Sequence, residues 1–113
     1  MADRNVIPPA ECTSMSEVRR EIDHIDEQLV ELLARRFAYV DRAWQLKMGT
    51  DEGATVPWRI QQVIDKVRAK AEEKGLPPAL AEALWRQMIG WFIQYEEERM
   101  SRRDADTDGN SNG

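Results

Sequence analysis

Two cations interrupt an otherwise apolar stripe in the first long periodic segment of the chain. The stripe follows a 4-3 spacing through Leu29 and Leu32, and its continuation falls on Arg36 and then on Lys47. One such residue is explained by snorkelling, in which the apolar stem covers the core and the charged head reaches water. Two in register, 11 positions and about 16 Å apart along a helix, favour a pocket for the two ends of a small dianion.

Arg19 and Glu96 also lie beside apolar positions. Arg19 precedes Arg36 by 17 positions, about 25 Å on a straight helix, so the two cannot grip one small molecule from the same chain. An antiparallel partner helix would bring a second Arg19 within reach; by periodicity alone, Arg19 is an exposed first-turn residue. Glu96 lies two turns after Met88, where a partly solvated carboxylate at the end of the core is the simpler interpretation.

Composition excludes most nucleophile and metal chemistry. A single Cys12 and a single His24 cannot form a disulfide framework, a zinc cage or a His-dependent triad within one chain, so we expect no metal and no cofactor. The net charge of −5 opposes binding to nucleic acid or anionic lipid. Without a signal core or an apolar run of about 20 residues, we expect a cytoplasmic protein with neither nucleic-acid nor membrane partners.

The first of the helices that must position these residues is predicted to be very long. Ser14 and Glu17 match the capping box of a helix start, and apolar spacing continues without Pro or Gly until Gly49, over about 33 residues. Such a helix measures roughly 50 Å, whereas a compact chain of this size has a diameter of about 35 Å. We therefore expect its stripe to be buried against a second copy, in a two-fold homodimer.

The rest of the chain predicts two further helices and no strand. A loop is expected over 48–56, a second helix from Pro57 to Gly75, and a third from about Ala79 to Met100. The predicted fold class is all-α with three helices. The predicted domains are an extended segment over 1–13, a helical domain over 14–100 and a disordered polar tail over 101–113.

A set of residues in the first predicted helix carries a family resemblance. They are Glu11-Cys12-Thr13, Val18-Arg19, Ile22-Asp23, Ile25-Asp26, Leu32-Leu33, Arg35-Arg36, Tyr39-Val40 and Lys47. This set resembles the first helix of the all-helical chorismate mutases. Arg59, the Gly75-Leu76 turn and the helix from Trp85 to Glu96 fit the same pattern, so the similarity covers roughly residues 8–97. The Pro8-to-Thr13 prefix is most similar to the short branch that includes isochorismate pyruvate lyase.

The resemblance implies an intertwined all-α homodimer with two equivalent pockets for a small dicarboxylate. By matching position, Arg19 of the partner chain and Arg36 of the same chain would bind the substrate carboxylates. Lys47 would donate to the ether oxygen, and Arg59 would help to bind the substrate. Glu96 occupies a position that is usually glutamine and is also directed at the ether oxygen, so we expect its carboxyl group to act protonated.

The implied activity is that of a chorismate mutase, an isomerase of the shikimate pathway and aromatic amino acid biosynthesis. Its pericyclic rearrangement of chorismate to prephenate needs no nucleophile or metal. It needs selection of the reactive conformer and stabilisation of negative charge on the ether oxygen. The scarcity of Cys and His is therefore no obstacle to this chemistry.

Three alternatives stay open at the level of sequence. One is isochorismate pyruvate lyase, which would convert isochorismate to salicylate and pyruvate with the same anion clamp. Another is an amino-substituted chorismate as substrate, because Ile60 and Phe92 replace polar residues that in many mutases bind the ring hydroxyl. The third is a non-catalytic helical dimer, a scaffold whose stripe cations merely snorkel.

Overall fold

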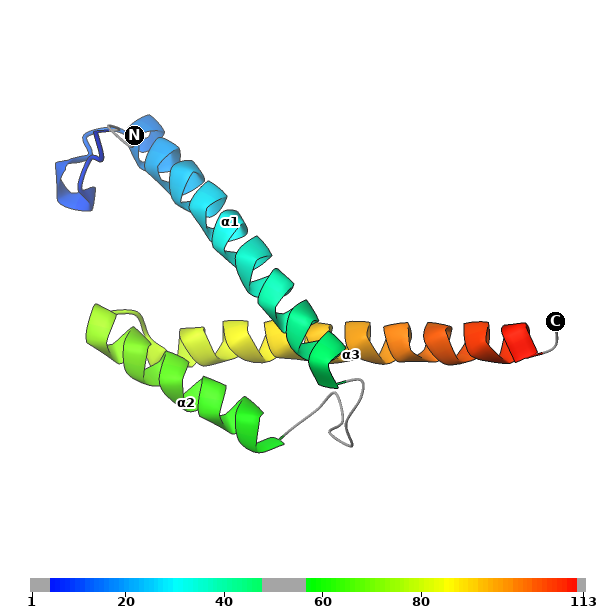
Figure 1. Cartoon of the computed structure of the whole chain (residues 1–113). Coiled ribbons are helices and arrows are strands. Elements are labelled where there is room, and N and C mark those ends of the chain that lie inside the picture. Colours follow the sequence, from blue (N-terminus) through cyan, green and yellow to red (C-terminus); the bar gives the residue numbers. More distant parts are fainter. Residues whose placement is uncertain (1–4, 48–56, 112–113) are drawn as a thin grey trace. The chain divides into compact units, whose positions relative to one another are not determined.

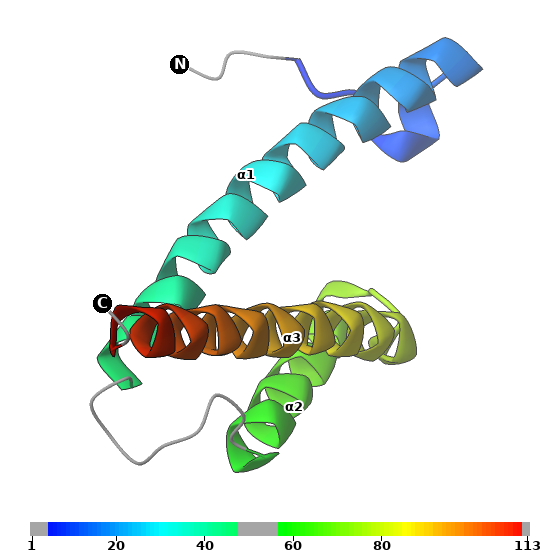
Figure 2. The ribbon, with the colours of Figure 1, turned by 90° about the vertical axis from the view of Figure 1, so that its right-hand side faces the viewer.

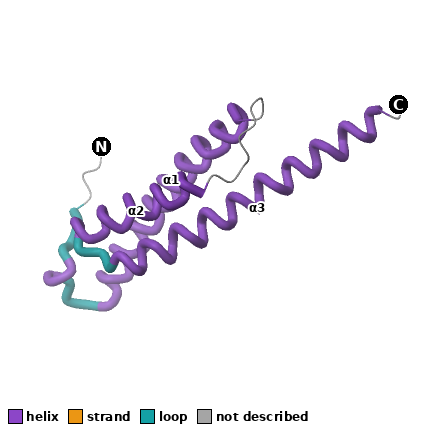
Figure 3. Tube along the Cα trace, turned by 90° about the horizontal axis from the view of Figure 1, so that it is seen from below, coloured by secondary structure: helices purple, strands orange, loops and turns teal. Residues whose placement is uncertain are grey.

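The computed structural model describes residues 5–47 and 57–111, with side chains described up to residue 102. These ranges contain a short 3-10 turn, η1 (Pro9–Glu11), and three long helices, α1 (Met15–Lys47), α2 (Pro57–Lys74) and α3 (Pro78–Ser111). No strand occurs in the described ranges (Figure 3), and the predicted all-α class with three helices is confirmed. The chain divides into two compact units, Met1–Ala43 and Trp44–Gly113.

The start of α1 is fixed by side-chain capping, as the sequence predicts. The Glu17 amide donates to Ser14 Oγ at 3.2 Å, which satisfies one of the free amides at the helix start. The Glu17 carboxylate accepts bonds from the Thr13 amide at 2.7 Å and the Thr13 hydroxyl at 3.0 Å, and these bonds lower the pKa of Glu17. From this cap α1 runs for 33 residues (Figure 1), the predicted length.

The apolar stripe of α1 is about half exposed in the first unit. Ile22, Ile25, Leu29 and Leu32 are between 50% and 54% exposed. Apolar side chains that repeat on one helix face normally pack against another element. The exposure of this stripe agrees with a second chain covering it, and the homodimer stays a prediction.

The second unit is built on a hairpin of α2 and α3, which pack side by side (Figure 2). Its turn is a Schellman motif, in which the Leu76 amide bonds to the Ala71 carbonyl at 2.8 Å and the Gly75 amide to the Glu72 carbonyl at 3.4 Å. The motif needs a residue with positive φ after the helix end, and Gly75 supplies it with φ +82°. The predicted second helix, ending at this glycine, is therefore confirmed.

Small side chains and one ion-pair cluster hold the hairpin together. Ala71 and Ala81 are at most 5% exposed, and Ile64 is 1% exposed. On the outer side, Glu82 of α3 accepts 2.6 Å bonds from Arg68 of α2 and from Arg86 on its own helix. The two guanidinium groups lower the pKa of Glu82. This hairpin is the framework on which residues 59 and 96 are carried.

The end of α3 differs from the prediction. We expected the helix to end near Met100, but its helical backbone continues to Ser111. Extending an existing helix avoids the cost of nucleation, so a polar segment can continue one without an apolar face to bury. The predicted loop over 48–56 lies outside the described residues. The domain boundaries at 1–13, 14–100 and 101–113 stay predictions.

Candidate active site

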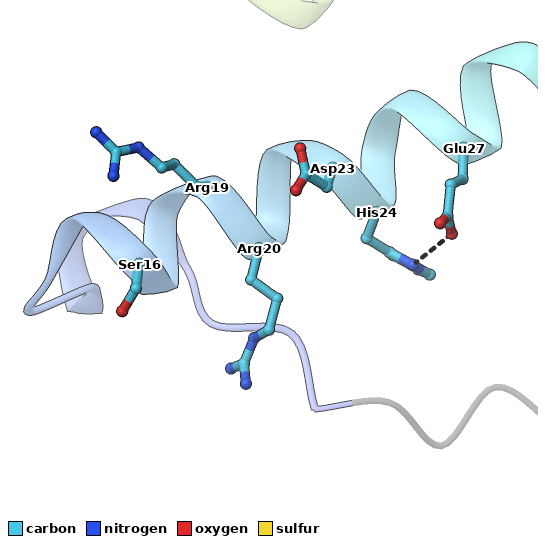
Figure 4. Close-up of a pocket in the computed structure, with 6 residues that line it drawn as sticks. All are labelled: Ser16, Arg19, Arg20, Asp23, His24 and Glu27. Carbon is cyan, nitrogen blue, oxygen red and sulfur yellow. Dashed lines mark ion pairs between the residues drawn. The ribbon is translucent and has the colours of Figure 1, made fainter.

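Arg19 lies one turn into α1, on a shallow open surface of the first unit. Figure 4 shows its exposed side chain leaving the helix on a different side from Arg20 and His24. His24 Nδ1 lies 3.9 Å from Glu27 Oε2, a pair that is ionic only when the imidazole is protonated. Carboxylates and cations are mixed on this surface, so the surface by itself has little preference for binding a dianion. The full lining is Ser16, Arg19, Arg20, Asp23, His24 and Glu27.

Arg36 differs from Arg19 in being half-buried on the stripe side of α1. Its Nη1 atom is buried, and the neighbouring Phe37 and Val40 are also half-buried. Because α1 is one unbroken helix over Met15–Lys47, Arg19 and Arg36 of one chain are about 25 Å apart along its axis. One chain therefore cannot bring these two arginines to a single small ligand.

Lys47 and Glu96 lie in the second unit, each one turn from a residue of a contact between α1 and α3. The guanidinium carbon of Arg99 lies 4.3 Å from the centroid of the Trp44 ring. Trp44 is three positions before Lys47, and Arg99 is three positions after Glu96. The last turn of α1 therefore meets the turn of α3 that carries Glu96. Both Lys47 and Glu96 are half-buried.

Arg59 lies in the first turn of α2 and is exposed. Its Nη1 donates a 2.6 Å hydrogen bond to Gln62 Oε1 on the same helix. Ile60 and Phe92 are half-buried apolar residues, and the Phe92 ring meets Trp91 edge to face at 5.3 Å between centroids. Neither side chain can bind a substrate hydroxyl through a hydrogen bond.

Sequence reasoning did not find the contact of Arg99 with two aromatic rings, those of Trp44 and Tyr95. The guanidinium carbon of Arg99 also lies 5.5 Å from the centroid of the Tyr95 ring, and Tyr95 stacks on Trp91 at 5.3 Å with the planes 13° apart. A cation one turn after Glu96 was visible in the sequence, but its contact with Trp44 joins segments far apart in the chain. Helical periodicity carries no information about such contacts.

The candidate site residues are four cations and one carboxyl group, of which Arg36, Lys47 and Glu96 are half-buried and the other two are exposed. Within 5–47 and 57–102 no cluster of three His, Cys, Asp or Glu side chains is placed to hold a metal ion. No helix in the described part of the chain is long and apolar enough to cross a membrane. Planar guanidinium groups recognise carboxylates through paired hydrogen bonds, and an ammonium group supplies a point charge.

These features agree with the comparisons with known proteins. The sequence model of the family described as chorismate mutase type II matches residues 18–97, and the chain belongs to this family. It is 34% identical over 85 residues to isochorismate pyruvate lyase of Pseudomonas aeruginosa, covering 75% of this chain and 83% of that protein. It is also 31% identical over 75 residues to T-protein of Enterobacter agglomerans, covering 66% of this chain and 20% of that protein.

Proposed function

We propose that this protein is a chorismate mutase, which rearranges chorismate to prephenate. The observation that carries the proposal is the family match over residues 18–97, which contains all five candidate site residues. They are Arg19, Arg36, Lys47, Arg59 and Glu96. Members of this family are enzymes, and an isomerase that works through positioning and electrostatics suits a chain with one Cys and one His.

The proposed mechanism divides the work between carboxylate binding and stabilisation of the ether oxygen. Arg36 and the partner chain's Arg19 hold the two substrate carboxylates and select the compact conformer in which the reacting carbons meet. Arg59 adds to substrate binding from the first turn of α2. As the C–O bond breaks, negative charge grows on the ether oxygen, and Lys47 donates to it from the end of α1.

Glu96 donates to the same oxygen in its protonated form. An ionised carboxylate there would repel the developing negative charge, whereas a carboxylic acid can donate its proton in a hydrogen bond. Partial burial and the dianionic substrate favour the neutral form, while Lys47 opposes it. Glutamine, the residue usual at this position in the family, is a permanent donor of the same length, which makes Glu96→Gln the matched variant.

The proposed active unit is a homodimer in which each pocket takes residues from both chains. The half-exposed stripe of α1 and the separation of about 25 Å between Arg19 and Arg36 both support this arrangement. A two-fold axis that pairs the α1 helices in antiparallel fashion would place one chain's Arg19 beside the middle of its twin.

A second candidate activity is isochorismate pyruvate lyase. It is favoured by the identity of 34% to a protein of that name, and the same cationic clamp suits isochorismate. Apolar Ile60 and Phe92 leave the ring substituent without a hydrogen-bond ligand at those two positions, which would also permit an amino-substituted chorismate.

The test incubates the purified protein separately with chorismate and isochorismate and measures prephenate, salicylate and pyruvate. We expect prephenate from chorismate; salicylate and pyruvate with no prephenate would establish the lyase instead. Arg36→Ala and Lys47→Ala should each lower kcat/KM by about a hundred- to a thousand-fold, as removal of a transition-state donor does. Arg20→Ala, which removes an exposed cation beside Arg19, is the matched control and should retain activity.

Titration with a bicyclic dicarboxylate that mimics the transition state separates an enzyme from a scaffold. Such mimics bind an enzyme more tightly than substrate does. Tight binding that is lost in Arg36→Ala supports the enzyme. Absence of binding, together with unchanged behaviour of Lys47→Ala, would leave the non-catalytic helical dimer as the better interpretation.

A further inference from the structure

Arg99 of α3 contacts the last turn of α1 through Trp44. Its guanidinium carbon lies 4.3 Å from the centre of the Trp44 ring and 5.5 Å from that of Tyr95. Trp44 is only 7% exposed, so the stacked face is largely sealed from water. A guanidinium group over an indole face is a favourable cation–π arrangement, and exclusion of water strengthens it.

Each of the two helices in this contact carries a candidate site residue one turn away from it. Lys47 is the last residue of α1, one turn beyond Trp44. Glu96 is one turn before Arg99 and adjacent to Tyr95 on α3. Tyr95 is itself stacked on Trp91 with an interplanar angle of 13°, so the Arg99 side chain rests on an ordered aromatic surface.

The end of a helix is the part that most needs such support. The last carbonyl groups have no partner within the helix, and terminal turns fray more readily than the interior. Lys47 occupies that terminal turn and has a flexible side chain of its own. An ammonium group displaced by about 1 Å loses much of its effect on a reacting oxygen.

We propose that Arg99 is a positioning residue, which stacks between Trp44 and Tyr95 and thereby holds Lys47 in its working place beside the Glu96 turn. The proposal rests on the proposed function, because it concerns the residue assigned to the ether oxygen. Arg99 acts through the rings and through the helix end. In this role Arg99 supports Lys47 and is not itself a substrate ligand.

The first arm of the test measures kinetics on Arg99→Met, which keeps the long stem and removes the charge. We expect kcat to fall about ten- to a hundred-fold, with KM changed by less than about threefold because the carboxylate ligands are intact. Arg99→Lys retains the charge but has no planar group to stack on the rings, so it should recover only part of the loss. In the Lys47→Ala background, Arg99→Met should cost almost nothing more, because the residue that it positions is already absent.

The second arm measures amide hydrogen exchange at residues 44–47 and needs no substrate. Arg99→Met should speed exchange there more than in the α2–α3 hairpin. Trp44→Phe, which keeps a ring but weakens the cation–π contact, should do the same to a smaller extent and remains usable if Arg99→Met does not fold. Arg102→Met is the matched control, because Arg102 carries the same charge one turn further on, is 74% exposed and pairs with Glu98 at 3.7 Å.

Each outcome decides the proposal. Faster exchange at 44–47 together with a kcat loss that disappears in the Lys47→Ala background supports it. Unchanged exchange overturns it, as does a loss that multiplies with that of Lys47→Ala, or a large rise in KM, which would indicate direct substrate binding. If the wild-type protein converts neither chorismate nor isochorismate, the proposed function fails and the positioning role fails with it. The exchange measurement would still establish whether Arg99 anchors the helix end.

Discussion

Mixing two inactive variants should restore activity if each pocket is shared between chains. Arg19 and Arg36 lie 17 positions apart on the unbroken helix α1, about 25 Å along its axis, whereas a small dicarboxylate spans less than half that distance. A pocket that uses both arginines must therefore take them from different chains. In a dimer of one Arg19→Ala chain and one Arg36→Ala chain, one pocket keeps both arginines and the other loses both.

The size of the recovery follows from counting pockets. If equal amounts of the two chains reassociate at random, about half of the dimers are mixed, and each mixed dimer has one intact pocket of two. The mixture should therefore regain about a quarter of wild-type activity, from parent variants that are each lowered about a hundred- to a thousand-fold. Such a rise is far larger than any error in protein concentration.

The assay mixes the variants after mild denaturation and refolding and follows substrate consumption, with mixed dimers counted by native mass spectrometry. The control mixes Arg36→Ala with Lys47→Ala. Both residues serve the same pocket from the same chain, so every pocket in that mixture is damaged and no recovery should occur. Background activity in the first mixture, despite abundant mixed dimers, would refute the shared-pocket geometry.

Three further changes test other parts of the structure. Turnover should fall as pH rises through neutrality, because Glu96 must be protonated to donate, and Glu96→Gln should flatten the profile; a wild-type rate that climbs with pH would contradict this role. Gly75→Ala should lower the free energy of unfolding in urea by about 1 to 2 kcal/mol. Because the added Cβ meets no atom within 4 Å, this cost comes from the backbone strain at φ +82° alone. Glu82→Gln should lower Tm at pH 7, because the two arginines depress the folded-state pKa of Glu82 below its ordinary value of 4.5. That stabilisation is present above pH 4.5 and is lost as pH falls through the depressed value, so the Tm values of both proteins should converge in acid.

The helices were predictable because their signals are local. The Ser14 cap, Pro57 in the first turn of α2 and Gly75 after its end each act on backbone groups within a few residues. The end of α3 was not predictable in this way. The segment beyond Met100 has no apolar face, but a helix that already exists can extend through it without a nucleation cost.

The candidate site was predictable only in part, for a different physical reason. Arg36 and Lys47 stood out because charged residues interrupt a periodic stripe, a pattern contained in one helix. Arg99 gave no such signal. The role that we propose for it rests on a contact with Trp44 across two helices, and the energy of a stacked guanidinium group depends on burial that only the folded chain provides.

Burial of the α1 stripe and completion of the proposed pocket would both be achieved by a second copy of this chain. The stripe residues Ile22, Ile25 and Leu29 are each at least 50% exposed, which leaves apolar surface whose transfer from water would favour association. Arg36 lies further along the same stripe, so a partner helix that covers the apolar residues also reaches the cation. A net charge of −5 opposes random association of chains. We therefore expect association at the apolar stripe, where the partner's Arg19 would reach the proposed site.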